Sequence, residues 1–524
     1  MKPSKLSFLK VWKVACFYFV FPLTGLLSLS GCQNKPRPSF IIVALDRLSF
    51  NAYSCADEKS NSSSGLDTLC KEAIRFTHAY TTSVQPAAAL GSLLTGNYPY
   101  VHGLHRGSGR MKSQAIRASV IADQQGYRTS FFSGSPAVMK KTGLAKGFDF
   151  FDDLSFLDQK NYLGQFKKQS DSFITWADES REPFFSIIYN SELESLNEAE
   201  TDISTFEKLD ENLATFFGEL KQNDLWNSNY VIVIGLQGQS DYSRYDESLM
   251  SNLHSENTNI SLFVKPPRQK GDDGINRKVD TFVNTADLGW ALIKTLNDSI
   301  TKPTDDHFPI VDLSILWKTP EGKSLPDLDR KLLIETINPW AVDLESRYAV
   351  LFKNFVYIEN NHDHIFNSLN DGLETIDLSN SLTSLSTDFK NDNRRILSSI
   401  RGSLKQNQWL DFKTDIDGWV SANREYWLDP ISRPTILADE WARFNATRIS
   451  QPLTTLMIQN YVVNNKVEAL RQLGFKIESA KTTEKDANLD EARRQSMNLS
   501  LENLWGIWGK NKNWAQSPLI KEYQ

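Results

Sequence analysis

The sequence is short of positive charge and of histidine. Over 524 residues, 58 lysines and arginines stand against 64 aspartates and glutamates, and there are only seven histidines. The net charge is −6, and no basic stripe interleaved with aromatic residues stands out. Such a stripe is the usual mark of a nucleic-acid-binding protein. We therefore do not expect nucleic acid to be a partner.

Long apolar runs are also scarce, and the one that stands out lies at the N-terminus. Four lysines in residues 2–13 precede an apolar run from about Val14 to Leu29. Pro22 and Gly25 interrupt that run, which weakens its interpretation as a retained membrane-spanning helix. A basic start, a short apolar core and small residues predict an export signal over residues 1–31. A multi-span membrane protein is not indicated.

The end of this signal, Leu29-Ser30-Gly31-Cys32, resembles the bacterial lipobox. The cysteine of a lipobox is diacylated and becomes the first residue of the mature protein, so Cys32 is the expected lipidation site. Plain secretion and a retained anchor are the alternatives. Gln33, in place of aspartate, favours the outer membrane under the sorting rule of many such lipoproteins. We expect a lipid-anchored protein of the bacterial cell envelope that faces the periplasm or the surface.

Cysteine is rare as well, with four residues in the whole chain. Cys16 leaves with the signal and Cys32 carries the lipid, so Cys55 and Cys70 remain as a pair in an oxidising compartment. We expect a disulfide between them, which would contribute about 3 kcal/mol in the loop-entropy model. Two separate buried thiols are the alternative.

The sequence does contain strands that alternate with helices, the pattern of a doubly wound, mostly parallel α/β sheet. Residues 40–45, FIIVAL, are continuously apolar, as a strand buried on both faces should be. Residues 64–76 and 205–226 show helical spacing of apolar side chains, and the strand YVIVIG follows at 230–235. Ligands of such a sheet bind outside the carboxyl ends of its strands.

From about residue 385 the pattern changes to long helical segments that hold seven of the thirteen tryptophans. We therefore predict three parts: the signal over 1–31, an α/β domain over 32–384 and a largely helical, tryptophan-rich region over 385–524. Tryptophans of this kind most often pack inside the protein, whereas an exposed cluster would indicate a carbohydrate or partner surface.

Ordered motifs between residue 38 and about residue 380 resemble the sulfatase family of the alkaline phosphatase superfamily. They are Phe40–Asp46, GLDTLCKEAIRFTHAYTTS, GSLLTGNYPYVHGLH, GYRTSFF, KGFDFFDD, YVIVIGLQG, SLFVKPP and HIFNSLNDGLET. The resemblance implies a sulfatase-like α/β fold. It also implies hydrolysis of sulfate esters by a formylglycine that is made from the first residue of a Cys/Ser-x-Pro-Ser-Arg-x-x-Leu-x-Thr-Gly motif.

The reactive residues of that motif are missing here. Counting back from Thr95-Gly96 puts Pro86 at the nucleophile position, and proline cannot become formylglycine. The motif's Pro, Ser and Arg fall on Ala88, Ala89 and Leu90.

A small shift of the loop would leave weak catalytic candidates. Ser83, Thr82 or Thr81 would then approach the site, but each needs a base or a metal to activate it. His102 matches a His-Gly position of sulfatases, although a structural histidine is the favoured interpretation. Lys265 matches a common family lysine, and we expect it to be a solvated strand end.

The resemblance also implies a calcium or magnesium ion held by oxygen ligands. In this chain the first acid persists as the residual ligand Asp46, its neighbour is Arg47, and the later ligand pair falls on Leu236 and Gln237. One carboxylate cannot hold such an ion against water, so we expect no cofactor. A strand-end or helix-cap role for Asp46 is equally well supported.

The sequence thus predicts an envelope lipoprotein whose sulfatase-like domain is catalytically degenerate and serves in binding or scaffolding. An anionic glycan, sulfated or phosphorylated, or an envelope protein is the expected partner besides the membrane. The predicted anion contacts are Arg47, His102, His105 and Arg106. One alternative is an active metal-dependent sulfate or phosphate ester hydrolase that uses a shifted serine or threonine and an unusual metal set, to which Asp241 or Asp246 could add a carboxylate. Another is a structural protein that assembles through its C-terminal region.

Replacing Cys32 with alanine should release the protein from membranes or block its maturation, because the lipid is the anchor that the sequence offers. Membrane fractionation and signal-cleavage analysis of the Cys32→Ala variant measure this. Unchanged fractionation with normal cleavage would contradict the lipoprotein prediction.

Overall fold

The computed structural model describes much of the chain between residues 37 and 404. The described residues are 37–50, 55, 64–105, 111–134, 138, 140–152, 165–195, 202–238, 253–268, 277–301, 307–318, 325, 329–337, 346–359, 363–381 and 384–404. The predicted signal with Cys32, Arg106, Asp241, Asp246 and the tryptophans beyond residue 404 lie outside this set. None of the described helices is long and apolar enough to cross a bilayer.

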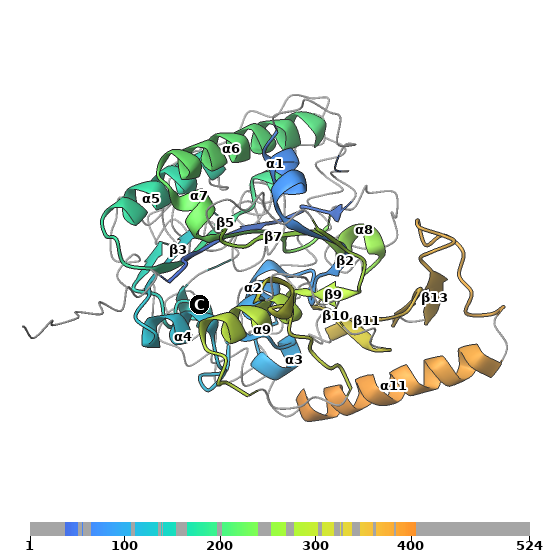
Figure 1. Cartoon of the computed structure of the whole chain (residues 1–524). Coiled ribbons are helices and arrows are strands. Elements are labelled where there is room, and N and C mark those ends of the chain that lie inside the picture. The colour runs from blue at the N-terminus through green and yellow to red at the C-terminus, as the bar shows by residue number, and fades with distance from the viewer. Residues whose placement is uncertain are drawn as a thin grey trace, which may run out of the picture. The chain divides into compact units, whose positions relative to one another are not determined.

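A mostly parallel sheet of nine strands forms the centre of the described part (Figure 1). Its strand order is β4-β3-β5-β1-β6-β7-β2-β8, with β9 paired to β2. Only β7 among these strands pairs antiparallel with its neighbours, β6 and β2. The strands are β1 (Phe40–Leu45), β2 (Ile74–Tyr80), β3 (Arg128–Ser133), β4 (Phe150–Asp152), β5 (Phe184–Asn190), β6 (Tyr230–Gly235), β7 (Asn259–Lys265), β8 (Arg277–Val279) and β9 (Val283–Asn284). The predicted doubly wound α/β fold is confirmed.

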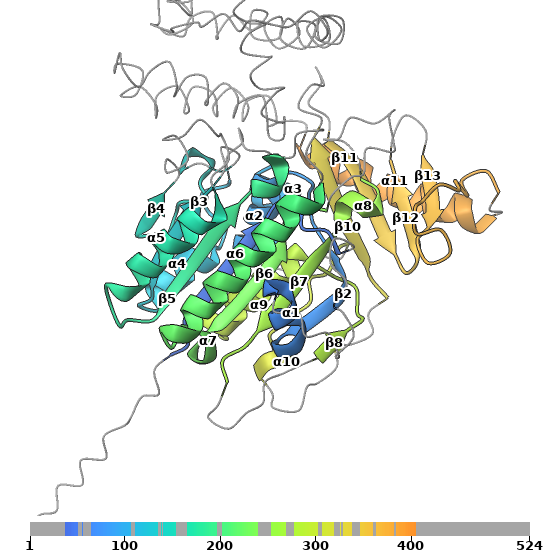
Figure 2. The same cartoon turned by 90° about the horizontal axis from the view of Figure 1, so that it is seen from above.

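Helices cover both faces of this sheet, as Figures 1 and 2 show. The helices on one face are α1 (Gly65–Glu72), α5 (Phe166–Asp178), α6 (Asp202–Gln222) and α7 (Leu225–Ser228). Those on the other face are α2 (Pro86–Thr95), α3 (Pro99–His102), α4 (Ala118–Gln124), α9 (Thr285–Leu296) and α10 (Ile315–Lys318). Side chains of β1 alternate between the two cores, with Ile41 and Val43 in one and Ile42 and Ala44 in the other. This double burial explains why β1 is apolar throughout.

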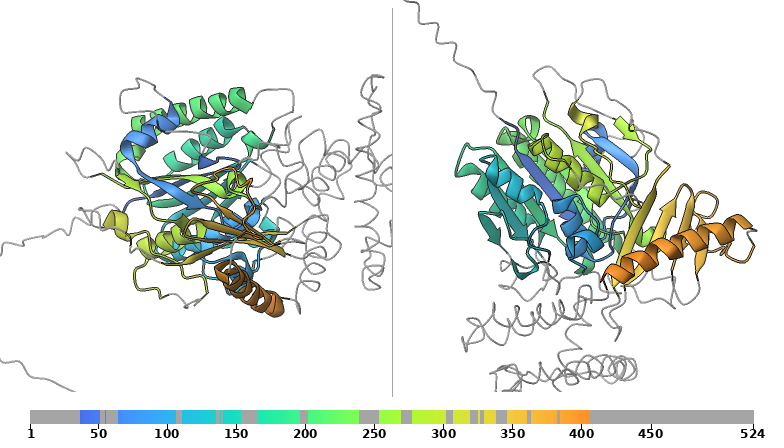
Figure 3. Two further views of the ribbon diagram at one scale, coloured as in Figure 1. Left: turned by 90° about the vertical axis from the view of Figure 1, so that its right-hand side faces the viewer. Right: turned by 90° about the horizontal axis from the view of Figure 1, so that it is seen from below.

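A second, antiparallel sheet of four strands follows the large one in sequence. It contains β10 (Lys331–Ile337), β11 (Ser346–Phe352), β12 (Phe355–Ile358) and β13 (His364–Asn367), paired in that order. Helix α11 (Ser384–Leu404) covers one face of it (Figure 3). The other face packs on Tyr80, Val84 and Leu253 of the large domain. The helix that opens the predicted C-terminal region therefore belongs with this small sheet.

The structure joins Cys55 and Cys70 by a disulfide, with 5.7 Å between their Cα atoms. Cys70 lies in α1, and both cysteines pack against the core under that helix. The bond thus ties Cys55 to α1.

A buried ion pair connects the large domain to the start of the small sheet. Arg330 Nη2 lies 2.5 Å from Asp287 Oδ2, and its Nη1 donates to Asp287 Oδ1 at 2.9 Å. The same carboxylate accepts from the backbone N–H of Asn284, the N-cap of α9, and from that of Val311. Both partners are buried, so each charge depends on the other.

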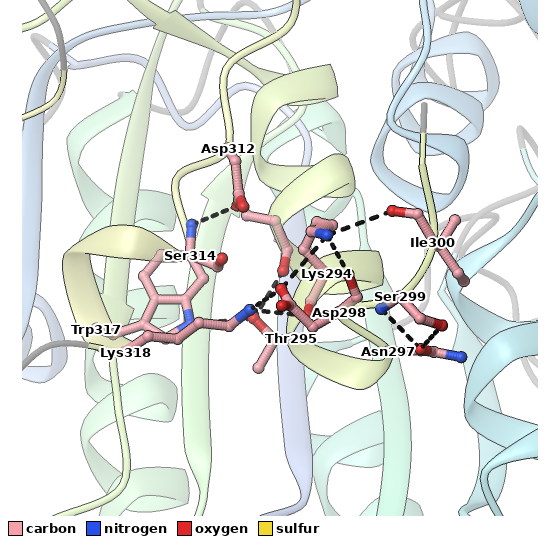
Figure 4. A network of polar contacts seen from close by, with 11 residues as sticks. Lys294, Thr295, Asn297, Asp298, Ser299, Ile300, Asp312, Ser314, Trp317 and Lys318 are labelled. Atoms are coloured by element: carbon pink, nitrogen blue, oxygen red, sulfur yellow. Dashed lines mark hydrogen bonds and ion pairs between the residues drawn. The ribbon is translucent and has the colours of Figure 1, made fainter. Parts of the chain in front are cut away.

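We predict that Asp287→Asn destabilises the protein by about 3–5 kcal/mol, because it leaves the Arg330 guanidinium buried without its counter-charge. The matched control is Asp298→Asn, just beyond the end of α9. Asp298 is 79% exposed and contacts Lys294 and Lys318 (Figure 4). Water screens that pair, so the control should leave the urea midpoint unchanged. Equal urea midpoints for the two variants would contradict the conclusion that the Asp287–Arg330 ion pair stabilises the fold.

Candidate functional site

Asp46 is the first polar residue after β1, and it is fully buried. Its backbone N–H donates to the Asn190 carbonyl at 3.0 Å, which continues the pairing of β1 with β5. The Tyr189 hydroxyl of β5 donates to Asp46 Oδ2 at 2.6 Å. The position predicted as the residual metal ligand thus holds a carboxylate that is hydrogen-bonded within the protein.

Arg47 stands next to Asp46 in a left-handed backbone conformation, with φ 56°. This conformation costs a non-glycine residue about 1–2 kcal/mol, and such strain often marks functional sites. The side chain is largely buried. Leu48 then accepts the Ser261 N–H at 3.1 Å, so the turn carries the chain from β1 toward β7.

Two uncharged residues follow β6 at the neighbouring strand end. The Leu236 N–H donates to the Leu45 carbonyl at 2.8 Å, and the Leu236 side chain belongs to the core on the α2 face. Gln237 is fully buried beside it. Leu236 has no side-chain oxygen that could bind a cation, and the side-chain amide of Gln237 is uncharged.

These residues do not fit a calcium or magnesium ion. Calcium takes six to eight oxygen ligands and magnesium six, several of them usually from carboxylates. Among Asp46, Arg47, Leu236 and Gln237 the one carboxylate is Asp46, whose Oδ2 already accepts from Tyr189. Among the described residues, no group of three His, Cys, Asp or Glu side chains is placed to hold a metal.

The nucleophile position lies in the first turn of α2. Pro86 begins this helix, where a missing N–H costs nothing. Every residue of α2 is buried, including Leu90 at the position of the family's arginine. The helix therefore keeps its place in the core without a nucleophile at its first residue.

Two of the three hydroxyl candidates that precede α2 are bonded to backbone groups, whereas Thr82 Oγ1 is buried without a hydrogen-bond partner among the described residues. Ser83 Oγ accepts from the Gln85 N–H at 3.1 Å. Thr81 Oγ1 donates to the Ser83 carbonyl at 2.7 Å and accepts from the Ser83 N–H at 3.2 Å. These bonds shape the turn into α2, which is the ordinary role of Ser and Thr in turns.

His102 is fully buried against α2. Its Nδ1 accepts from the Leu104 N–H at 3.1 Å, so the neutral ring carries its proton on Nε2, which lies 3.1 Å from Ser92 Oγ. Burial lowers the pKa of His102 well below its usual value. A Cβ on Gly91 would lie 2.6 Å from His102 Cε1, so Gly91 makes room for the ring.

Two glutamates of the small-sheet region contact histidines of the large domain, and sequence reasoning missed both contacts. The carboxylate of Glu335 in β10 contacts His105 Nδ1. Glu374, after β13, accepts at 2.8 Å from His254, which precedes α8 (Ser255–Thr258). Both glutamates are fully buried. His105 is therefore paired with an acid, and no local pattern signals this contact.

Residues 38–297 match the model of the sulfatase family. The chain belongs to this family. The matched residues contain the large sheet. All the motifs that resemble sulfatases begin within residues 40–297, except HIFNSLNDGLET, which begins in the small sheet. The predicted resemblance is thus confirmed, within the alkaline phosphatase superfamily.

Two curated relatives are sulfatases by name. The N-acetylgalactosamine-6-O-sulfatase of Bacteroides thetaiotaomicron is 32% identical over 87 residues, which cover 15% of this chain and 17% of that one. The ulvan-active sulfatase of Formosa agariphila is 21% identical over 373 residues, covering 59% of this chain and 70% of that one. The first match thus spans less than a fifth of that relative's length.

The phosphonate monoester hydrolase of Agrobacterium radiobacter shares the fold, with a TM-score of 0.54 and 13% identity. The superposition covers 70% of this chain and 96% of that one.

Close helix packing explains why this sulfatase-family chain keeps the GSLLTG segment. A Cβ on Gly289 of α9 would lie 2.4 Å from the Leu93 carbonyl of α2. Gly96 ends α2 with φ 58°, and a Cβ there would lie 2.6 Å from the Trp290 backbone nitrogen. Both glycines are required where the two helices touch.

Lys265 is buried at the end of β7, contrary to the expected solvated strand end. Its Nζ donates to the carbonyls of Trp226 and Asn229. Burial lowers the pKa of Lys265 to about 7.

This pKa predicts a stability that rises with pH. An unfolded lysine titrates near pH 10.4. Between pH 7 and that value the unfolded chain therefore binds one more proton than the folded chain, and stability increases by up to about 1.4 kcal/mol per pH unit. Urea unfolding of the wild type and of Lys265→Met from pH 7 to 10 measures the difference in slope. If the unfolding free energies of the two proteins rose equally with pH, the lowered pKa of Lys265 would be contradicted. Lys353→Met, at an exposed lysine, is the control and should keep the slope of the wild type.

Proposed function

We propose that this sulfatase-family protein does not hydrolyse sulfate esters and serves as a lipid-anchored binding or scaffolding protein of the bacterial cell envelope. The observation that carries the proposal is Pro86 at the first turn of α2. Its ring offers neither a hydroxyl nor a thiol, so no formylglycine can form at this position.

The charge-handling groups are depleted together with the nucleophile. Ester hydrolysis needs a cation to neutralise the ester and an acid for the leaving group. At the positions of the family's arginine and of its later metal ligands the chain has Leu90, Leu236 and Gln237, all buried and uncharged. Loss of one group would slow a reaction, whereas loss of several removes the stabilisation of charge in the transition state.

Sulfated or phosphorylated glycans are the ligand class that we propose. The names of two relatives, an N-acetylgalactosamine-6-O-sulfatase and an ulvan-active sulfatase, support a carbohydrate sulfate. Of the four predicted anion contacts, His102 is held neutral in the core and His105 lies on Glu335. The proposal therefore relies chiefly on Arg47 and leaves Arg106 as a further contact.

Purified mature protein should release no nitrophenol from p-nitrophenyl sulfate or p-nitrophenyl phosphate above the buffer rate, with or without added calcium or magnesium. An active sulfatase in the same assay controls for the conditions. Turnover that Asp46→Ala abolishes would overturn the proposal and favour the hydrolase alternative. Turnover that Asp46→Ala leaves unchanged would indicate a contaminating enzyme. In that case the activity should elute apart from the protein in size-exclusion or ion-exchange chromatography.

A further inference from the structure

We infer that the Tyr189 hydroxyl has taken over the cation's place at the end of β1, so that Asp46 is a structural, metal-independent carboxylate. The inference concerns the same strand end as the proposed function, but it rests on hydrogen bonding and packing rather than on the lack of hydrolysis. It assigns Tyr189 a role that no sequence motif indicates.

The contact between the two side chains is short and fully buried. The Tyr189 oxygen lies 2.6 Å from Asp46 Oδ2, within the range of O–H hydrogen bonds to a charged acceptor. Neither side chain is exposed to solvent. A buried carboxylate is costly unless hydrogen bonds satisfy it, and this hydroxyl supplies one.

The tyrosine ring is fixed where it stands. Its strand pairs on both sides, with β1 and with β3, and Tyr189 lies opposite Ala44 in the first of these pairs. The ring belongs to the same core cluster as Ile42, Ala44 and Leu236. Interiors of this kind are close-packed, so moving the ring aside to admit an ion would disturb the packing of this core.

A cation on the same oxygen would compete with this hydrogen bond. Calcium binds oxygen at about 2.3–2.6 Å and magnesium at about 2.0–2.1 Å. At Oδ2 the phenol oxygen already stands at 2.6 Å and directs its proton toward the carboxylate. The apolar Leu236 fills the neighbouring strand end, which in the family contributes a ligand. The two changes complement one another, since the hydroxyl bonds one oxygen of the acid at the strand end where the later ligand position holds a leucine.

A double-mutant cycle on the mature protein tests the inference. Tyr189→Phe should lower the thermal midpoint by several degrees, and it should lower the midpoint much less in an Asp46→Asn background. Tyr98→Phe is the matched control, because the Tyr98 hydroxyl is equally buried but accepts from the neutral Asn284 amide. The control should lower the midpoint by the same amount in the wild-type and in the Asp46→Asn background. Additive effects of Tyr189→Phe and Asp46→Asn would overturn the inference.

Metal binding gives a second readout that needs no variant. The wild-type midpoint should be the same in EDTA and in millimolar calcium or magnesium chloride, and elemental analysis should find far less than one metal per chain. One tightly held equivalent, or a midpoint several degrees higher with metal, would overturn the inference. Metal binding without ester turnover would refute this inference alone, and turnover without metal would refute only the proposed function.

Discussion

The contact between α2 and α9 is the constraint on which the arrangement of the site depends. Gly289 and Gly96 let the two helix backbones approach within ordinary contact, and neither position tolerates a Cβ without a shift of main chain. This contact fixes the C-terminal half of α2 against α9. A chain that abandoned the GSLLTG segment would lose that packing, so the segment persists whether or not the helix carries a nucleophile.

Replacement of the family's reactive side chains and retention of the packing are therefore compatible in this fold. Pro86, Leu90 and Leu236 stand at positions of reactive or charged family residues, and all three are buried. An apolar side chain at such a position strengthens the core, because it no longer requires a buried charge to be satisfied. The remaining acid, Asp46, is accommodated by the hydroxyl of Tyr189. The result is a sulfatase-family domain whose strand ends are part of its interior.

Local patterns in the sequence predict the large sheet well, because strands buried on both faces need continuous apolar runs such as those of β1 and β6. Counting along the family motifs likewise places Pro86 at the nucleophile position and Asp46 at the position of the first metal ligand. The contacts that define these residues come from distant segments, which local pattern does not reveal. Tyr189 lies 143 residues from Asp46, and Glu335 lies 230 residues from His105. His105 thus looks like an anion contact in the sequence, although in the fold it lies against a buried acid.

The most direct test of the account is a crystal structure of the mature protein grown with manganese chloride, with anomalous differences measured around Asp46. The account predicts no anomalous peak at the end of β1 and a Tyr189 oxygen at hydrogen-bond distance from Asp46 Oδ2. A manganese peak coordinated by Asp46, with Tyr189 displaced from the carboxylate, would contradict it.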